Sequence, residues 1–479
     1  MKLKKIALNK YIIFLILFIF NYILYVRLNS YEIISSHDLE ASFVKGRKVS
    51  FQNLPYSNVW DGKGPLFFYI YKIFDLITFN AMSIINLLVI LLKTLISFLI
   101  FNNNFKQSEL TSIALLPTFF YILIATNNIF GNSIYYEEIV ILILIFCIFT
   151  EKKYANYAFS GILIASATLL INVTYIFLPL FLYRAYKNNK TLNFITSFTF
   201  VNLITVLIFY LNDLFEIFMY TNVIYPFAYA SEKANVGLLS IFFLLKDNVS
   251  YFSFFYFVIL CGLFMYFFVK DKTKFDLSVN SITTLYLILF SIFIPIISGK
   301  YYGHHYLYFL VFFLYNLSFY YRKSESNFNI LQLGFYRIIS FLFIFFTVYP
   351  SFNANSSEMN IFMEYEYEII ANELVESYPE VETIFANKNI IMSNFTNLIA
   401  VNYVAFTPLY FDKPELVENL QQYANNADSI DLIIKTKPDV LICGLNFKDF
   451  YETYCKSEDY FFYKDFNYSS IFINKKFQN

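Results

Sequence analysis

The stretch SHDLEASFVKGRKVSFQNLPYSNVWDGKGPL, residues 36–66, is the most polar part of the first hundred residues. It follows an apolar run at residues 11–26 and precedes a second long apolar region. Charged side chains such as Asp38, Asp61 and Lys63 are costly between two such runs unless they face water or a polar ligand. The first membrane crossing therefore delivers this stretch to a membrane face, and we interpret it as a candidate active-site loop.

The composition excludes an ordinary water-soluble domain. Of the 479 residues, 58% are hydrophobic and only 15% are charged, which is typical of a polytopic membrane protein. The 35 basic residues balance the 35 acidic residues, so the net charge gives no reason to expect a nucleic-acid partner. We therefore expect the lipid bilayer to surround most of the chain.

About eleven apolar segments are candidate membrane spans, because a bilayer core takes about 20 apolar residues per helix and fewer where helices are short. They lie at residues 11–27, 80–101, 109–126, 135–150, 154–170, 173–184, 192–212, 252–270, 279–297, 306–321 and 333–350. The lysine-rich start predicts an uncleaved signal anchor with a cytoplasmic N-terminus. Basic residues gather in the loops then predicted to be cytoplasmic, among them the loop that contains Arg184. The odd number of spans places the C-terminal region outside.

Two charged side chains fall within candidate spans. Lys93 and Arg337 each lie within reach of the predicted cytoplasmic end, so we expect both to snorkel to that surface. A transporter more often keeps an ionisable residue near the bilayer midplane. This placement therefore counts against transport.

The sequence changes character near residue 351. Periodic patterns predict helices at residues 358–377 and 414–425 and short strands at 389–393, 439–443 and 468–474. The chain thus divides into a transmembrane domain at residues 1–350 and a small extracytoplasmic α/β domain at residues 351–479. Cys443 and Cys455 could form a disulfide if this region is extracytoplasmic, and the sequence leaves their pairing open.

Part of the polar stretch matches a known family. Asp38, then Pro55 and Tyr56, then DGKGPL at residues 61–66 resemble the first-loop signature of bacterial polyprenyl-phosphate-sugar-dependent glycosyltransferases of the GT-C superfamily. These are relatives of the protein O-mannosyltransferases and the lipid A aminoarabinose transferases. In that group a lone Asp precedes "PY" and "DHKGPL" at about this spacing. Gly62 stands here where the family has His.

A second element, GNSIYYEE at residues 131–138, is similar to the family's "GN…TEE", with Tyr136 where Thr is usual. Glu137 and Glu138 are adjacent carboxylates at the outer start of a span, which is unfavourable unless they meet water, a metal or a donor. The alternative is a solvated helix N-terminus, where acidic residues complement the positive end of the helix dipole.

Two further elements fall in outer turns. Asn172 resembles the family's Asn between two short spans, although an Asn there also suits a simple turn. The stretch SGKYYGHHY at residues 298–306 resembles "G(R/K)xxxHY", with His305 and Tyr306 as its matching residues. Interfacial aromatics with polar turn residues would explain that stretch as well.

The resemblance implies a role for each residue type. Moving a sugar from a polyprenyl phosphate to a hydroxyl needs a carboxylate to deprotonate the hydroxyl and cations to hold the departing phosphate. In the family the first-loop Asp is that carboxylate, so we expect Asp38 to be the catalytic base. We expect Lys63 to bind the phosphate, with Lys300 and His305 as second choices.

The remaining candidates support these groups. We expect Glu137 or Glu138 to position the acceptor or, as an alternative, to ligate a divalent cation. No cofactor is otherwise implied. The other expected substrate-binding or supporting residues are Glu40, Tyr56, Asp61 (by pairing with Lys63), Asn172 and Tyr306.

The sequence thus predicts an α-helical polytopic membrane protein of GT-C type in a bacterial inner membrane, with its active site and C-terminal domain extracytoplasmic. The expected donor is a polyprenyl-phosphate sugar, and the acceptor is a glycan, lipid or protein. Two alternatives stay open. One is a polysaccharide polymerase or ligase that uses polyprenyl-pyrophosphate glycans, and the other is a lipid-linked sugar flippase or transporter.

Overall fold

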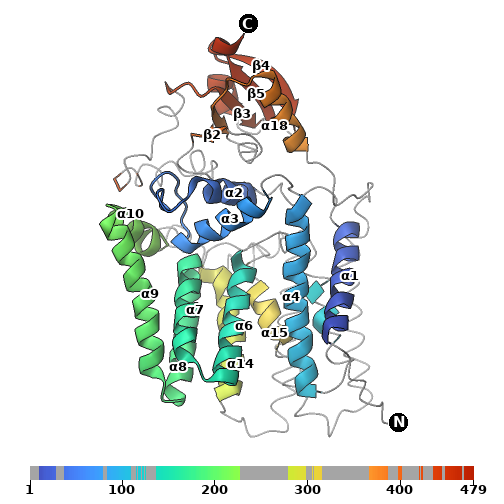
Figure 1. The fold of residues 1–479 in the computed structure, drawn as a ribbon, viewed down its shortest axis with the longest axis vertical. Helices are drawn as coiled ribbons and strands as arrows, with labels where there is room; N and C mark the ends of the chain where they lie inside the picture. The colour runs from blue at the N-terminus through green and yellow to red at the C-terminus, as the bar shows by residue number, and fades with distance from the viewer. Residues whose placement is uncertain are drawn as a thin grey trace, which may run out of the picture.

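A computed structural model describes residues 10–28, 37–78, 83–108, 115, 117–119, 121–122, 125, 136–226, 279–297, 305, 307–315, 366–386, 398–401, 420, 422–423, 435–444, 448–466 and 469–478. Its larger part is a helical bundle (Figure 1). The bundle helices are α1 (Lys10–Leu28), α4 (Ser83–Ser108), α6 (Tyr136–Tyr154), α7 (Tyr157–Leu170), α8 (Leu178–Lys187), α9 (Thr191–Leu211), α14 (Val279–Ile297) and α15 (Leu307–Tyr315).

Two of the described helices are long and apolar enough to cross a membrane, at Leu87–Lys106 within α4 and Thr191–Leu211, which is α9. Only 11% of the α9 segment is buried inside the protein. Its exposed face includes Phe200, Leu203 and Leu207, and leaving such a side chain in water costs about 1.5–3 kcal/mol relative to burying it. A hydrocarbon environment removes this cost, so α9 fits the outside of a membrane bundle.

One of the segments expected to cross the membrane differs from the structure. Residues 173–184 do not form one span, because a 3-10 turn, η2 (Asn172–Phe177), precedes the ten-residue α8. A Pro at the start of α8 suits a new helix N-terminus rather than a helix interior. The spans predicted at residues 252–270 and 333–350, the latter with Arg337 just inside it, lie outside the described residues.

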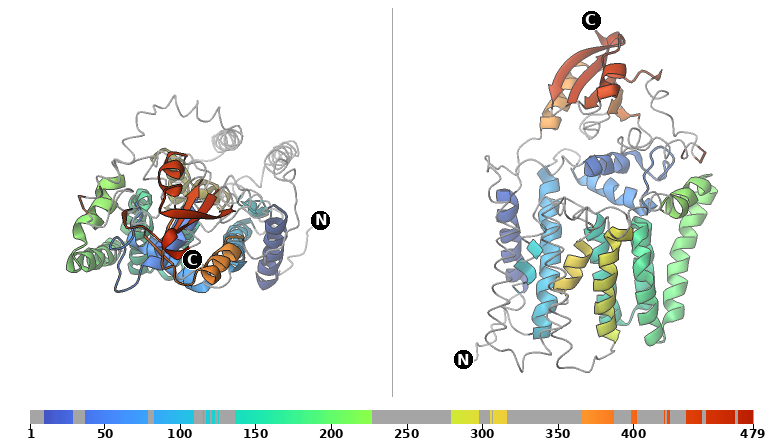
Figure 2. Two further views of the ribbon diagram at one scale, coloured as in Figure 1. Left: turned by 90° about the horizontal axis from the view of Figure 1, so that it is seen from above. Right: turned by 180° about the vertical axis from the view of Figure 1, so that it is seen from behind.

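Residues 36–66, interpreted above as a loop, are helical in their first half. Helix α2 (His37–Lys48) packs on α3 (Pro65–Thr78), and both lie across one end of the bundle (Figures 1 and 2). Gly46 permits this contact, because a Cβ there would lie 2.4 Å from the Tyr71 carbonyl carbon. Phe43 packs edge-on against the same tyrosine. The turn between the two helices, residues 49–64, is therefore held against the end of the bundle.

A buried ion pair ties three helices together at the opposite end of the bundle. Arg184 of α8 donates to Glu151 of α6 at 2.5 Å and to Thr283 of α14 at 2.7 Å. Both charged side chains are at most 5% exposed. Arg184 was predicted to lie in a loop, and that placement was wrong because it belongs to α8 and its guanidinium is enclosed by this contact.

The C-terminal domain is built on a five-stranded sheet. The strand order is β2 (Ile399–Ala400), β1 (Thr383–Ala386), β3 (Val440–Gly444), β5 (Ser469–Asn474) and β4 (Tyr460–Phe466). The strands β2, β1 and β3 pair in parallel, and β5 pairs antiparallel with both β3 and β4. The other described elements of the domain are α18 (Glu366–Ser377), the short α23 (Lys448–Phe450), the π-helical η5 (Tyr451–Cys455) and the 3-10 turn η6 (Lys475–Phe477).

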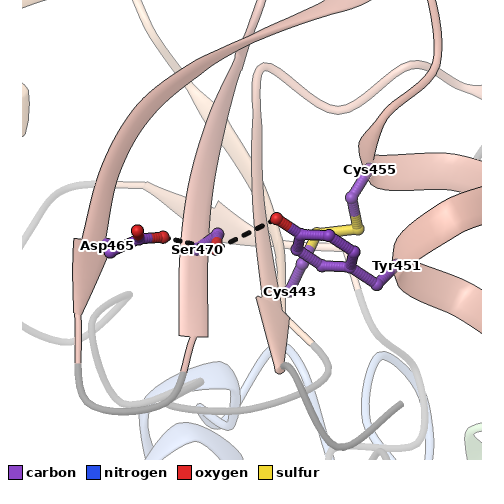
Figure 3. The surroundings of a disulfide bond; sticks show 5 residues. All are labelled: Cys443, Tyr451, Cys455, Asp465 and Ser470. Carbon is purple, nitrogen blue, oxygen red and sulfur yellow. Dashed lines mark hydrogen bonds between the residues drawn. A yellow bond between two sulfur atoms is a disulfide. The ribbon is translucent and has the colours of Figure 1, made fainter. Parts of the chain in front are cut away.

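Several C-terminal predictions can be compared with this sheet. The strands at β3 and β5 and the helix at α18 lie where the pattern predicted them, whereas β1, β2 and β4 were not foreseen. The strand predicted at residues 389–393 lies outside the described part of the chain. The sequence left the cysteine pairing open, and Cys443 and Cys455 are joined by a disulfide that fastens η5 to the end of β3 (Figure 3).

Candidate active site

The turn at residues 49–64 carries Lys63 and is fixed by hydrogen bonds around Tyr56. The Tyr56 hydroxyl donates to the Lys63 carbonyl at 2.6 Å and accepts from Asn222 Nδ2 at 3.3 Å. Tyr56 is buried and has a φ of 70°, a backbone conformation that costs a non-glycine residue of order 1–3 kcal/mol. Such a conformation persists only where the surroundings impose it, so Tyr56 is held in one place. Its hydroxyl in turn holds the Lys63 carbonyl.

The side chain of Lys63 lies at the N-terminal end of α6. Its Nζ donates to the Tyr136 hydroxyl at 2.5 Å and lies 4.3 Å from the centre of the Tyr136 ring. We predicted that Asp61 would pair with Lys63, and this was wrong. Asp61 instead pairs with Lys45 of α2, which leaves Lys63 directed to the start of α6.

Two glycines let the turn approach the bundle closely. The Gly64 N–H donates to the Leu170 carbonyl at 3.3 Å, and a Cβ at Gly64 would lie 2.1 Å from the Leu169 carbonyl oxygen at the end of α7. At Gly62, a Cβ would lie 2.1 Å from a ring carbon of Tyr225. The Tyr225 ring therefore takes up the space that any side chain at position 62 would need.

Glu138 belongs to a buried polar cluster inside the bundle. Its Oε1 accepts from Lys93 Nζ at 2.5 Å and from the Tyr121 hydroxyl at 3.0 Å. Lys93 is 1% exposed and Glu138 is fully buried. The prediction that Lys93 snorkels to the cytoplasmic surface was wrong, because its ammonium group finds a carboxylate within the bundle instead.

Glu137 lies beside the only described residue of the predicted 298–306 stretch. His305 Nε2 is 3.7 Å from Glu137 Oε1, and both side chains are at least nine-tenths buried. Tyr308 of α15 is also fully buried. Adjacent carboxylates on α6 thus have different neighbours, a lysine for Glu138 and a histidine for Glu137.

The structure describes the remaining predicted residues to different extents. Asn172 begins η2, directly after the end of α7 that contacts the turn. Asp38 and Glu40 lie in the first turn of α2, but their side chains lie outside the described part of the structure. Lys300 and Tyr306 lie outside the described residues altogether.

Three residues that position the site were missed by the sequence reading: Lys45, Tyr121 and Asn222. They contact Asp61, Glu138 and Tyr56 across 16, 17 and 166 positions of the chain. None of the three belongs to a motif that marked the predicted residues. Lys93 was noticed as a charge within a span, and its pairing with Glu138 could have been proposed because intramembrane charges usually pair with one another.

The arrangement brings a lysine, a histidine and two carboxylates to one end of the bundle, under α2 and α3. Such a set can hold an anionic group and accept a proton from a hydroxyl. Among the side chains that the structure describes, no three His, Cys, Asp or Glu residues gather to hold a metal ion. No protein-family model and no curated protein matches the chain.

Proposed function

We propose that the chain is a membrane glycosyltransferase of GT-C type, which moves a sugar from a polyprenyl-phosphate donor to an acceptor hydroxyl on the extracytoplasmic face. The observation that carries this proposal is the contact of Lys63 with Tyr136 at the start of α6, where the following residue, Glu137, approaches His305. These residues come from three separate segments that the sequence motifs had singled out. A phosphate-binding cation therefore lies beside groups able to orient a hydroxyl.

In the proposed reaction the acceptor oxygen attacks the anomeric carbon while the bond from that carbon to the phosphate oxygen breaks. Asp38 takes the proton of the acceptor hydroxyl. Lys63 stabilises the negative charge that grows on the departing polyprenyl phosphate, and this contact is stronger in the transition state than in the ground state. The Tyr136 hydroxyl and ring hold the Lys63 ammonium ready for that role.

The two adjacent glutamates have different parts in this proposal. Glu138 is already engaged by Lys93 and Tyr121 within the bundle, so it serves to fix the start of α6. Glu137, beside His305, is the carboxylate that positions the acceptor. A divalent cation at Glu137 remains the alternative role for this residue.

Charge and cysteine chemistry support the proposed orientation in a bacterial inner membrane. Basic residues occupy the last turns of α4, α6 and α8, at the end of the bundle away from the C-terminal sheet (Figure 1). This agrees with cytoplasmic loops rich in Lys and Arg. The disulfide in the C-terminal domain agrees with an oxidising, extracytoplasmic location. We retain about eleven crossings as part of this proposal.

One observation favours a second candidate, a lipid-linked sugar flippase or transporter. The pair Lys93–Glu138 is buried within the bundle, and transporters commonly carry such ionisable groups. In a transporter, Lys93 would be needed for movement of the lipid while Asp38 would be dispensable. In the transferase proposal, by contrast, Asp38 is required for activity.

The test measures consumption of a panel of polyprenyl-phosphate sugars in membranes that contain wild type, Asp38→Asn, Lys63→Ala or the control Lys72→Ala, with the lipids followed by mass spectrometry. We expect wild type and the control to consume one donor, Asp38→Asn to consume none, and Lys63→Ala to be slower by about 10²-fold. Undiminished turnover by Asp38→Asn would refute the base assignment. Movement of an intact lipid-linked sugar across the membrane, without consumption, would favour the transporter.

A further inference from the structure

A π-helical turn packs on the turn that carries Lys63. This turn, η3 (Tyr220–Ile224), follows the short helix α10 (Phe215–Met219). Its Thr221 Oγ1 accepts from Trp60 Nε1 at 2.9 Å, and its Asn222 Nδ2 donates to the Tyr56 hydroxyl at 3.3 Å. π-Helical turns are rare and often occur at functional sites. Two consecutive residues of η3 therefore hold two residues of the turn that carries Lys63.

The residue before them faces the C-terminal region. The Tyr220 ring stacks on the Tyr423 ring, with centroids 4.5 Å apart and planes inclined by 19°. Tyr220 is 4% exposed, so the stack is largely closed to solvent. The Tyr423 backbone N–H donates to the carbonyl of Leu420, which is fully buried. This hydrogen bond closes a turn that joins Tyr423 to Leu420.

We propose that η3 transmits the position of the C-terminal domain to Lys63, so that the donor-phosphate site is complete only when Tyr423 is docked on Tyr220. The inference rests on the proposed function, because it takes Lys63 to bind the donor phosphate. The contacts form an unbroken series from Tyr423 through η3 to Tyr56, whose hydroxyl holds the Lys63 carbonyl. Tyr423, Tyr220, Thr221 and Asn222 are positioning residues in this scheme.

Trp60 supplies a readout that needs no substrate. It is the single tryptophan of the chain, is 2% exposed, and packs edge-on against Tyr225. Its fluorescence, excited where tyrosine does not absorb, reports whether the turn stays packed on η3. The test compares the purified full chain with Tyr423→Ala, with Tyr423→Phe, which keeps a stacking ring, and with Tyr378→Ala, which deletes a tyrosine packed within the C-terminal domain.

We expect Tyr423→Ala to shift Trp60 emission to longer wavelength and to increase its quenching by iodide, while Tyr423→Phe and Tyr378→Ala leave both unchanged. For transfer, Tyr423→Ala should lower kcat/KM for the donor by between about twofold and about tenfold, which corresponds to the loss of one aromatic pair. The loss should fall mainly on kcat, because Lys63 acts most strongly in the transition state. Tyr423→Phe should restore the wild-type kcat. Thr221→Val, which removes the Trp60 acceptor, should shift emission in the same direction as Tyr423→Ala.

The outcomes separate this inference from the proposed function. Unchanged Trp60 emission in Tyr423→Ala would overturn the inference, whatever happens to activity. An equal shift in Tyr378→Ala would also overturn it, because a general loosening of the domain would then suffice. A shift confined to Tyr423→Ala and Thr221→Val, in a protein whose wild type consumes no donor, would support the coupling and refute the transferase.

Discussion

Replacing Lys93 by Met should destabilise the bundle strongly, whereas replacing Lys93 and Glu138 together should not. The two charges are 2.5 Å apart and almost fully buried. At an effective dielectric constant of about 20 their gross attraction is about 7 kcal/mol, and most of it offsets the cost of removing both ions from water. Lys93→Met leaves the Glu138 carboxyl enclosed without its cation, with the Tyr121 hydroxyl as its remaining donor among the described residues, which should cost about 3–5 kcal/mol.

The assay is thermal unfolding of purified protein in detergent, followed by helical circular dichroism. The double variant Lys93→Met/Glu138→Gln keeps an acceptor for Tyr121 and carries no buried charge, so its stability should lie within about 1 kcal/mol of wild type. Lys72→Met is the matched control on α3, where a partly exposed lysine makes one hydrogen bond to the Arg47 carbonyl; it should cost about 1 kcal/mol or less. Equal stabilities for Lys93→Met and Lys72→Met would refute the buried ion pair.

Three further predictions concern other parts of the fold. Gly64→Ala places a Cβ 2.1 Å from the Leu169 carbonyl oxygen and should cost about 1–3 kcal/mol, with Trp60 emission shifted to longer wavelength. Burial opposes ionisation of Asp439, but its lysine partner and two backbone N–H groups outweigh burial and lower its pKa. The stability that it provides should be complete above its ordinary pKa of 3.8 and be lost as pH falls through the lowered pKa, and Asp439→Asn should remove this acid dependence in an unfolding series. Cys443→Ser opens a disulfide between residues 12 positions apart and should destabilise the C-terminal domain by about 3 kcal/mol, an effect that a reductant should reproduce in wild type and not in the variant.

Sequence alone could identify the residues that carry charge in an apolar chain. Lys63 and Glu137 were singled out because charged groups next to apolar runs are costly unless they face water or a polar partner and because their stretches resemble motifs of one family. His305 was singled out by that resemblance. The structure brings these three segments together through the Lys63–Tyr136 contact and the Glu137–His305 approach. These residues could be recognised because the chain is 58% hydrophobic and only 15% charged, so each charged residue next to an apolar run is unusual.

The residue with which each charged side chain pairs was harder to predict than which charged side chains belong to the site. Asp61 and Lys63 are two positions apart, so a local pair was the simplest expectation, yet Asp61 pairs with Lys45 across the α2–α3 packing. Likewise Lys93 pairs with a glutamate 45 positions further along the chain. Sequence patterns carry the period of a helix, but the rotation that turns one helix toward another depends on side-chain packing throughout the bundle. Pairings therefore had to come from the structure.

The buried pair also explains how two neighbouring carboxylates can serve different purposes. Consecutive residues on a helix point about 100° apart, so Glu138 faces α4 and Lys93 while Glu137 faces His305. An ion fixed by a buried partner loses the freedom to exchange a proton or to move toward a ligand, and in return it holds its helix in one rotation. Fixing α6 through Glu138 therefore presents Glu137 in a constant direction next to Tyr136, the residue that contacts Lys63. Because this reasoning assigns orientation to Glu138, a Gln at 138 combined with Met at 93 should keep the direction of Glu137, and loss of transfer in that stable double variant would show that Glu138 takes part in the chemistry itself.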